Sequence, residues 1–586
     1  MERMYHRVPS NITVPRTLVV TPAQRASLRV HSSFVGLRRL ASHPALWCAI
    51  ILALCVLVSR PRLEMGFDDD FSYIWTARAM AATGHFVYNR WSTAMLGWQI
   101  YLGAFFIKLF GFSFTTVRAS VLLLGMATAA LLQRVFVRVG VNEWNATLAT
   151  VTLTVSPLFL PLTFSFMSDV PGFLAILVCL YGCIRAVQAS SDRAAIRWLI
   201  LAALSNAIGG TARQIAWLGV LVLVPSTAWV IRRRRGVLVV AAALWVISAA
   251  FIAGCLHWFK AQPYSVSEPL IAGIHYRSHK YQAILLFSLP ILIAFVARYP
   301  VRERWARIQA GAAVGAMVAV GGICAAMWHR IPEFLLAPFS DGEVTAKGLE
   351  IGGMFGHRPD VLPMAVRIAL TLLTFSAFFA FLILIVNASR LEKLPDAGNA
   401  GQISNRALVE ILGPFTAAYL VLSVTRATVF ERYFLPLLLV FLIFLLRFYQ
   451  ARVASRLPPL TAVFVILLGA YGVVAFHDLM ATDRAELDAA DELRAAGVPR
   501  REIRAGIEYD GWTQIELTGY LAPKPPWHEP PPCVFWWDSD TPAIQGRYRL
   551  SYSPSSCFPE SEFPPLHYTT WLPPRHQQIY ILKLLK

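Results

Sequence analysis

Apolar runs of around twenty residues recur along most of this chain, for example GVLVVAAALWVISAAFIAGCLH at 236–257. A helix of this length crosses a bilayer because it satisfies its own backbone hydrogen bonds where water is absent. Only 15% of the 586 residues are charged and the mean hydropathy is +0.53, whereas a soluble domain has about a quarter charged residues. The runs therefore predict a polytopic α-helical membrane protein.

Hydropathy places about 13 transmembrane helices in the chain. The predicted spans are 44–59, 115–133, 146–164, 170–187, 197–210, 214–231, 236–257, 281–297, 308–327, 361–386, 407–423, 430–446 and 459–476.

Arg and Lys gather in alternate loops between these spans. The tail 1–43 contains seven Arg against one Glu, and a later loop is the run Arg232 to Arg235. Such loops stay on the cytoplasmic side, so the pattern predicts a cytoplasmic N-terminus and, after an odd number of spans, an extracytoplasmic C-terminus. The net charge of +19 is thus a matter of topology and does not indicate nucleic-acid binding. The Arg-rich loops favour a bacterial inner membrane.

Three domains are expected from this layout. A cytoplasmic basic tail covers 1–43, a transmembrane domain covers 44–477, and an extracytoplasmic domain covers 478–586. The first outer loop, 60–114, contains two segments with helical patterns, 70–83 and 94–111, which are predicted to lie at the membrane surface or re-enter it.

The C-terminal domain is predicted to be a small α/β module. The stretch RAELDAADELRAAG has helical spacing and stops at a Gly, while RYRLSYS and QQIYILKLL have strand patterns. Cys533 and Cys557 lie in this domain. They would face an oxidising compartment, so we expect a disulfide, the alternative being two unpaired thiols.

Acidic residues mark two of the predicted outer loops. Asp68, Asp69 and Asp70 lie at the outer mouth of the first span, and Asp169 lies in SFMSDVPGF between the third and fourth spans. Carboxylates at membrane depth are costly and usually functional. Asp also favours solvated loops and helix N-caps, which is the alternative. Two loops that each present Asp near the bilayer suggest one shared site.

The residues Asp69, Asp70, Tyr73, Arg78 and Gly84 have a spacing that resembles a known signature. It is similar to the "DE…Y…AR…G" motif of the GT-C glycosyltransferases, which include protein O-mannosyltransferases and the lipid A aminoarabinose transferase. SDVPG (168–172) and ERYFLPLLL (431–439) are similar to later motifs of that family.

The resemblance implies an inverting transfer of a sugar from a polyprenyl-phosphate carrier to the hydroxyl of a glycan, lipid or protein. The acceptor hydroxyl needs a positioned base. Asp70 stands where the family often has Glu, and Asp68 is an extra carboxylate, so the motif leaves the base open. Counting back from Gly84 favours Asp69, with Asp70 and Asp169 as its catalytic partners and no defined role for Asp68.

Basic residues near the predicted outer face could bind the donor phosphate. Arg432 lies in ERYFLP and Arg213 in GGTARQIAW, while Lys260 and Arg277 lie in one outer loop. Each could instead be a cation that snorkels to the membrane surface.

A divalent cation could be held by Asp70, Asp169 and His275, although no spacing demands one. The main alternative function is a transporter or flippase for lipid-linked sugars. Transporters usually show internal repeats and charges at the midplane, and neither is evident here. A noncatalytic membrane subunit would not need Asp69, Asp169 and Arg432 to converge.

Overall fold

The computed structural model describes residues 43–267, 273, 278–326, 335–339, 342–350, 353–392, 394, 402–426, 429–523 and 533–584. The predicted basic tail, except for His43, lies outside the described residues, and so do His275 and Arg277.

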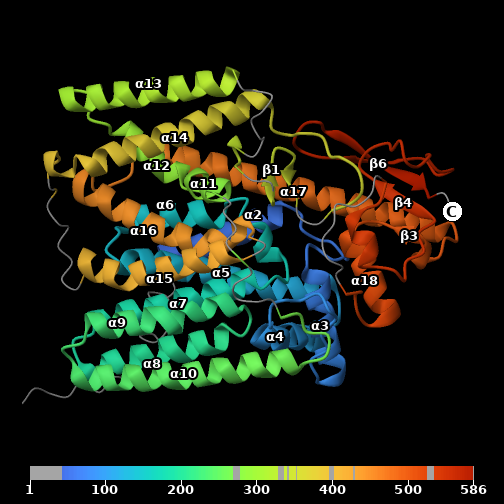
Figure 1. Cartoon of the computed structure of the whole chain (residues 1–586), viewed down its shortest axis with the longest axis horizontal. Helices are drawn as coiled ribbons and strands as arrows, with labels where there is room; N and C mark the ends of the chain where they lie inside the picture. The colour runs from blue at the N-terminus through green and yellow to red at the C-terminus, as the bar shows by residue number, and fades with distance from the viewer. Residues whose placement is uncertain are drawn as a thin grey trace, which may run out of the picture.

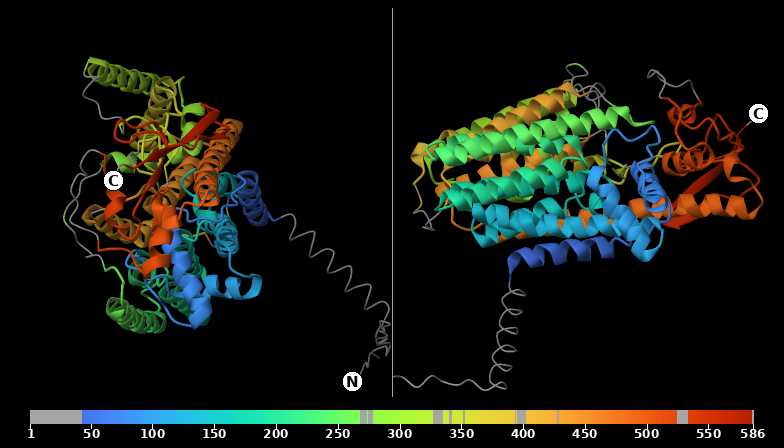
Figure 2. Two further views of the ribbon diagram at one scale, coloured as in Figure 1. Left: turned by 90° about the vertical axis from the view of Figure 1, so that its right-hand side faces the viewer. Right: turned by 90° about the horizontal axis from the view of Figure 1, so that it is seen from below.

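Long helices lie side by side in a bundle, and a small sheet domain projects from one end of it (Figures 1 and 2). The bundle helices are α2 (Pro44–Val58), α5 (Phe114–Arg138), α6 (Glu143–Thr154), α7 (Asp169–Gln188), α8 (Asp192–Gly209), α9 (Val224–Val230), α10 (Arg235–Ala261), α11 (Ser278–Phe287), α12 (Leu289–Ala297), α13 (Arg304–Ala326), α14 (Met364–Val386), α15 (Asn405–Thr425), α16 (Leu435–Arg452) and α17 (Pro459–Ala495). Several begin at a polar cap, as at Ser113 and Ser191, whose side chains accept backbone N–H groups of the first turn.

Within the described residues, seven helices are long and apolar enough to cross a membrane. A bent pair, Lys280–Phe287 with Leu289–Ala297 at 60°, would make an eighth. The chain is therefore a multi-pass helical membrane protein, but the count of 13 spans is not confirmed. Some predicted spans are short or broken: α2 has 15 residues, and α6 ends at Thr154 before Pro157 and Pro161, where proline interrupts helical hydrogen bonding.

Two short helices follow α2, as the pattern of the first outer loop predicts. They are α3 (Asp70–Thr83) and α4 (Gly97–Phe110), each of 14 residues, which is too short to span a bilayer. The first ends at Gly84, whose φ of +76° is left-handed and suits a residue without a Cβ. Both lie at the end of the bundle that faces the sheet domain (Figure 1).

Helix α17 continues from the bundle into the C-terminal domain over 37 residues. The helix predicted in RAELDAADELRAAG is the end of this element, so the domain boundary at 477/478 cuts through a continuous helix. No proline interrupts α17 after its first residue, and Gly497, with φ of +87°, ends the helix.

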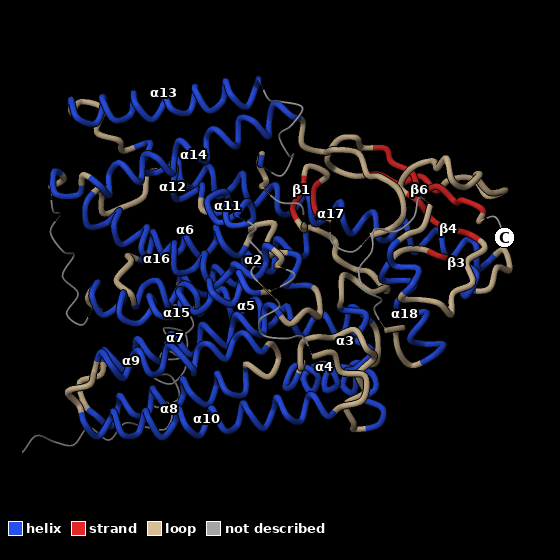
Figure 3. Tube along the Cα trace, in the orientation of Figure 1, coloured by secondary structure: helices blue, strands red, loops and turns tan. Residues whose placement is uncertain are grey.

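The C-terminal domain contains a four-stranded sheet in the order β3-β4-β6-β5. Figure 3 labels β3, β4 and β6 of this sheet. β3 pairs with β4 in parallel and the other neighbours are antiparallel, with Leu550 opposite Ile581. The elements are β3 (Ile503–Arg504), α18 (Ile507–Thr518), β4 (Tyr548–Ser551), β5 (Leu566–Thr569) and β6 (His576–Lys583). A separate hairpin of β1 (Val344–Thr345) and β2 (Gly348–Leu349) lies in the loop before α14.

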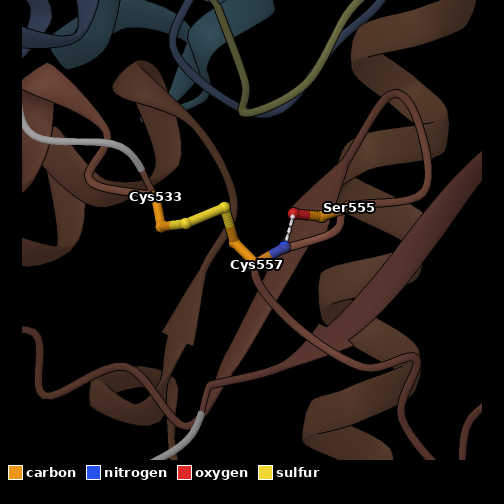
Figure 4. Close-up of a disulfide and its surroundings, with 3 residues drawn as sticks. All are labelled: Cys533, Ser555 and Cys557. Atoms are coloured by element: carbon orange, nitrogen blue, oxygen red, sulfur yellow. Dashed lines mark hydrogen bonds between the residues drawn. A yellow bond between two sulfur atoms is a disulfide. The ribbon is translucent and has the colours of Figure 1, made fainter.

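Cys533 and Cys557 form a disulfide that closes the loop between them, 24 residues apart in the sequence (Figure 4). It joins the segment before η9 (Trp536–Ser539) to the loop that follows β4.

A candidate active site at one end of the bundle

Three helix starts bring the candidate residues together. Asp69 is the N-cap residue of α3, Asp169 is the first residue of α7, and Arg432 lies in η7 (Glu431–Phe434), directly before α16. Carboxylates at helix N-termini interact favourably with the helix dipole. The charged side chains therefore gather at one end of the bundle, not at its middle.

Arg432 lies at the centre of the cluster and is 3% exposed. Its Nη1 contacts the carboxylates of Asp68 and Glu343. Its Nε lies 3.8 Å from Asp169 Oδ2, and its Nη2 lies 4.0 Å from Asp69 Oδ2. One guanidinium thus faces four carboxylates from three separate segments of the chain.

Arg213 is the second cation of the site. Its Nη1 lies 3.0 Å from Asp169 Oδ2 and donates a hydrogen bond to Ser168 Oγ. The guanidinium lies 4.4 Å from the centre of the Tyr433 ring, within the range of a cation–π contact. Gly172 permits this approach, because a Cβ there would lie 3.0 Å from the Arg213 Cβ. The Gly of SDVPG is therefore needed for packing.

Asp69 is the carboxylate that lines the pocket beside these arginines. Its side chain is 27% exposed, and its Oδ1 accepts a hydrogen bond of 2.6 Å from Trp91 Nε1. The pocket is lined by Asp69, Tyr73, Thr93, Ala94, Met167, Arg213, Gln214, Ile215, Tyr419, Ser423, Arg426, Val429, Arg432 and Tyr433. It therefore combines one carboxylate with three arginines.

Asp68, which the sequence left without a role, belongs to the cluster through its contact with Arg432. Burial raises the pKa of the Asp68 carboxyl to about 7, although Arg432 opposes the shift. Burial likewise raises the pKa of Glu343 to about 8, again opposed by Arg432. Four carboxylates against two arginines would give the cluster a net charge of −2 if all were ionised. Protonation of Asp68 and Glu343 lowers that excess.

Asp70, which was predicted to be catalytic or a metal ligand, is not among the residues that line the pocket. Its side chain is fully buried and pairs with Arg118 on α5, at 2.7 Å to Nε and 3.0 Å to Nη2. The backbone N–H groups of Phe67 and Phe166 also donate to it. These four hydrogen bonds use both carboxylate oxygens, so Asp70 fastens α3 to α5.

The predicted metal site is not assembled in the described part of the chain, where no group of three or more His, Cys, Asp or Glu side chains could hold an ion. Asp70 is engaged by Arg118, and Asp169 lies between Arg213 and Arg432. Two guanidinium groups would repel a cation at that position. His275 lies outside the described residues.

Lys260, a predicted phosphate ligand, is exposed in the last turn of α10 and is not among the residues that line the pocket. Arg277, the other ligand predicted in that loop, lies outside the described residues. Lys280 instead lies 3.6 Å from Glu431, whose Oε2 accepts the Glu343 N–H.

Sequence reasoning missed Glu343, Trp91 and Arg118 as contributors. Arg118 had a signal, because an arginine inside an apolar span requires a partner. Glu343 and Trp91 lie in polar loops, where nothing in the local pattern distinguishes them from solvated residues.

No protein-family model matches this chain, and no curated protein matches it in sequence. Solved structures of GT-C proteins are similar to it in fold. The S. cerevisiae protein O-mannosyltransferase Pmt1–Pmt2 complex bound to the sugar donor is 13% identical, with a TM-score of 0.29, over 41% of this chain and 37% of that chain.

ArnT from Cupriavidus metallidurans bound to undecaprenyl phosphate is 13% identical, with a TM-score of 0.38, over 91% of this chain and 98% of that one. The archaeal oligosaccharyltransferase AglB from Archaeoglobus fulgidus, in complex with an inhibitory peptide and a dolichol-phosphate, is 13% identical, with a TM-score of 0.41, over 85% of this chain and 63% of that chain. This chain spans less than two thirds of the O-mannosyltransferase and AglB chains. At these TM-scores the likeness is partial, and we infer function from the residues of the site.

Proposed function

We propose that this protein is an integral-membrane inverting glycosyltransferase. It moves a sugar from a polyprenyl-phosphate carrier to an acceptor hydroxyl of a glycan, lipid or protein, with Asp69 as the general base. The observation that carries the proposal is the pocket that is lined by Asp69, the only carboxylate among the lining residues, together with Arg213, Arg426 and Arg432.

The arrangement supplies the groups that such a transfer needs. Asp69 accepts the proton of the acceptor hydroxyl as its oxygen forms a bond to the sugar C1. The bond from C1 to the phosphate oxygen breaks on the opposite face, and the electron pair leaves with the polyprenyl phosphate. Guanidinium groups stabilise the charge that develops on this phosphate. Attack opposite to the leaving group inverts the anomeric centre.

An apolar groove would suit the prenyl chain of the donor. It is lined by residues of α11, α12, α14 and α17 together with Val344. Val344 lines the groove and its sequence neighbour Glu343 contacts Arg432, so one short segment links the groove to the charged cluster. Val366 and Leu467 line the groove and are 42% and 57% exposed, which would allow entry from the lipid phase.

The position of the charges favours transfer over transport. They lie at helix starts at one end of the bundle, whereas transporters place their sites near the bilayer midplane. The loop Arg232 to Arg235 joins α9 to α10 at the other end, away from the sheet domain (Figure 1). This arrangement supports an extracytoplasmic site, with the basic loops in the cytoplasm.

The test is a transfer assay in vesicles that contain the purified protein, a panel of polyprenyl-phosphate sugars and envelope glycan, lipid or peptide acceptors. We expect Asp69→Asn to lower kcat by about 10²–10⁴-fold with little change in donor KM, since general-base catalysis contributes about that much. Asp488→Asn, at an exposed position of α17, is the control and should retain activity. Unchanged transfer in Asp69→Asn would refute the base assignment, and movement of the lipid-linked sugar across the vesicle without transfer would favour the transporter.

A further inference from the structure

We propose that the C-terminal domain is a positioning part of the active site, which fixes the Asp68 backbone through Glu508 and the Asp69 side chain through Trp537. The inference rests on the proposed function and gives this domain a role other than binding the acceptor or covering the bundle.

The first contact holds the backbone beside the base. Asp68 has a left-handed backbone, with φ of +54°, which is unfavourable for a residue that carries a Cβ. Its N–H donates a hydrogen bond of 3.1 Å to Glu508 Oε1, on the first turn of α18. This bond bridges the catalytic loop and the C-terminal domain, and it favours the strained conformation in which the Asp68 carboxylate reaches Arg432.

Close packing supports the same contact. A Cβ on Gly66 would lie 3.1 Å from the Glu508 Cβ and 2.6 Å from the Phe71 Cβ. A Cβ on Gly511 of α18 would lie 2.6 Å from the Phe71 ring. Only glycine leaves room at these two positions, so α18 lies directly against the start of α3.

The second contact acts through aromatic rings. Trp91 donates its Nε1–H to Asp69 Oδ1 at 2.6 Å. Its ring packs edge-on against Trp537, with centroids 4.9 Å apart and an interplanar angle of 89°. Phe71 lies 6.3 Å from the Trp91 ring and 6.4 Å from the Trp537 ring. Trp537 is fully buried, so the C-terminal domain supports the indole that orients the base.

Glu508 and Trp537 act by position and not by chemistry, because neither is among the residues that line the pocket. Glu508 is 6% exposed. Burial and the nearby carboxylate of Asp483 raise the pKa of Glu508 well above its usual range, so the neutral acid can accept the Asp68 N–H through its carbonyl oxygen. A glutamine can make the same hydrogen bond, which provides a conservative variant.

The experiment compares Glu508→Gln with Glu508→Met in full-length protein in vesicles. The two side chains have similar length, and only glutamine can accept the Asp68 N–H. We expect Glu508→Met to lower kcat by about 10-fold to 100-fold, since small displacements of catalytic groups have effects of this size, with donor KM within about twofold. Glu508→Gln should retain the wild-type kcat, and so should Glu492→Met, at an exposed position of α17.

Two outcomes separate this inference from the proposed function. Full kcat in a folded Glu508→Met protein, while Asp69→Asn is inactive, would overturn the positioning role alone. Full activity in Asp69→Asn would overturn the proposed base itself. If Glu508→Met does not fold, Trp537→Phe decides. This variant keeps a buried ring but loses part of its contact with Trp91, and an unchanged kcat would overturn the inference.

Discussion

Arg432 shows how strongly the charges at this site compete with one another. The guanidinium faces Asp68, Asp69, Asp169 and Glu343 before any donor binds. In the proposed reaction a lipid phosphate would share Arg432 with carboxylates, and their protonation would decide how strongly they compete. Donor affinity should consequently depend on pH even though the arginine stays charged.

The first residue-scale prediction concerns Glu343→Gln. Burial raises the pKa of Glu343 to about 8 against the opposing effect of Arg432, with Glu431, Asp68 and Asp169 also nearby. Below about pH 7 Glu343 is neutral, and as the pH rises through about 8 it ionises and competes for Arg432. The donor KM of the wild type should rise by about tenfold between about pH 7 and pH 9, and much less in Glu343→Gln.

The measurement is donor KM across this range, with Glu350→Gln as the control. Glu350 belongs to the same loop, and its carboxylate pairs with Lys347 instead of Arg432. Equal pH dependence in wild type and Glu343→Gln would show that Glu343 does not compete with the donor. Burial raises the pKa of Asp68 to about 7. Ionisation of Asp68 therefore contributes to the rise in donor KM near pH 7, both in the wild type and in Glu343→Gln.

The three adjacent aspartates have three different environments. Asp68 reaches Arg432, Asp69 lines the pocket, and Asp70 is buried against Arg118. Successive residues at a helix start project about 100° apart around the axis, and the left-handed Asp68 adds a further turn of the chain. Neighbours in the sequence therefore face different parts of the molecule.

At the element scale, α4 holds the loop that carries Arg213. Trp98 donates its backbone N–H to Thr211 Oγ1 and its Nε1–H to the Gly209 carbonyl. Gly97 lies so close to this loop that a Cβ would be 2.1 Å from Thr211 Oγ1 and 2.4 Å from the Thr211 Cβ. Helix α4 thus sets the position of Thr211 and, through it, that of Arg213 two residues later in the sequence.

We accordingly predict that Gly97→Ala displaces the Arg213 loop and raises donor KM by about tenfold, with a smaller effect on kcat, because binding is the step that Arg213 supports. Gly236→Ala is the matched control, since it also lies in a first helical turn and its added Cβ would meet nothing within 4 Å. The measurement is steady-state transfer kinetics for both variants. A normal donor KM in folded Gly97→Ala protein would contradict the role given to α4.

At the scale of the whole molecule, the bundle and the sheet domain pack against each other through several elements. Helix α17 runs through both, α18 packs on α3, and the N–H of Ile507 donates to the carbonyl of Gly353 in the loop before α14. Loss of order in the C-terminal domain should therefore reduce catalysis even though this domain supplies none of the residues that line the pocket.

The disulfide tests this dependence. Replacing Cys533 and Cys557 by Ser opens a loop whose ends are 24 residues apart, which should destabilise the domain by about 3 kcal/mol and lower its unfolding temperature by about 10–20 °C. Thermal unfolding in detergent and residual transfer activity should decline together. Cys255→Ser, which removes a free cysteine of α10, is the control. Unchanged unfolding temperature in the double variant would contradict the prediction.

Local sequence patterns were sufficient to predict the class of the protein and the elements that hold the site. Apolar length requires helices in a bilayer, and helices occur at the start of the first outer loop, at Asp169 and before α16. Strand patterns likewise predicted β4 and β6, because strand periodicity is local. The number of spans was less accessible, since hydropathy does not show where Pro157 or the bend at Ser288 interrupts a helix.

Which charges meet could be learned only from the folded chain. Asp70 and Asp69 are adjacent in the sequence, yet one lies against Arg118 and the other beside Arg432. Glu343 and Glu508 come from distant segments, and Glu343 contacts Arg432 while Glu508 accepts the Asp68 N–H. Such contacts depend on how the helices pack and where the loops lie in the folded chain, and neither can be predicted from local composition. The physical reason is that a charge becomes functional here through its burial and its partners, and both are properties of the folded chain.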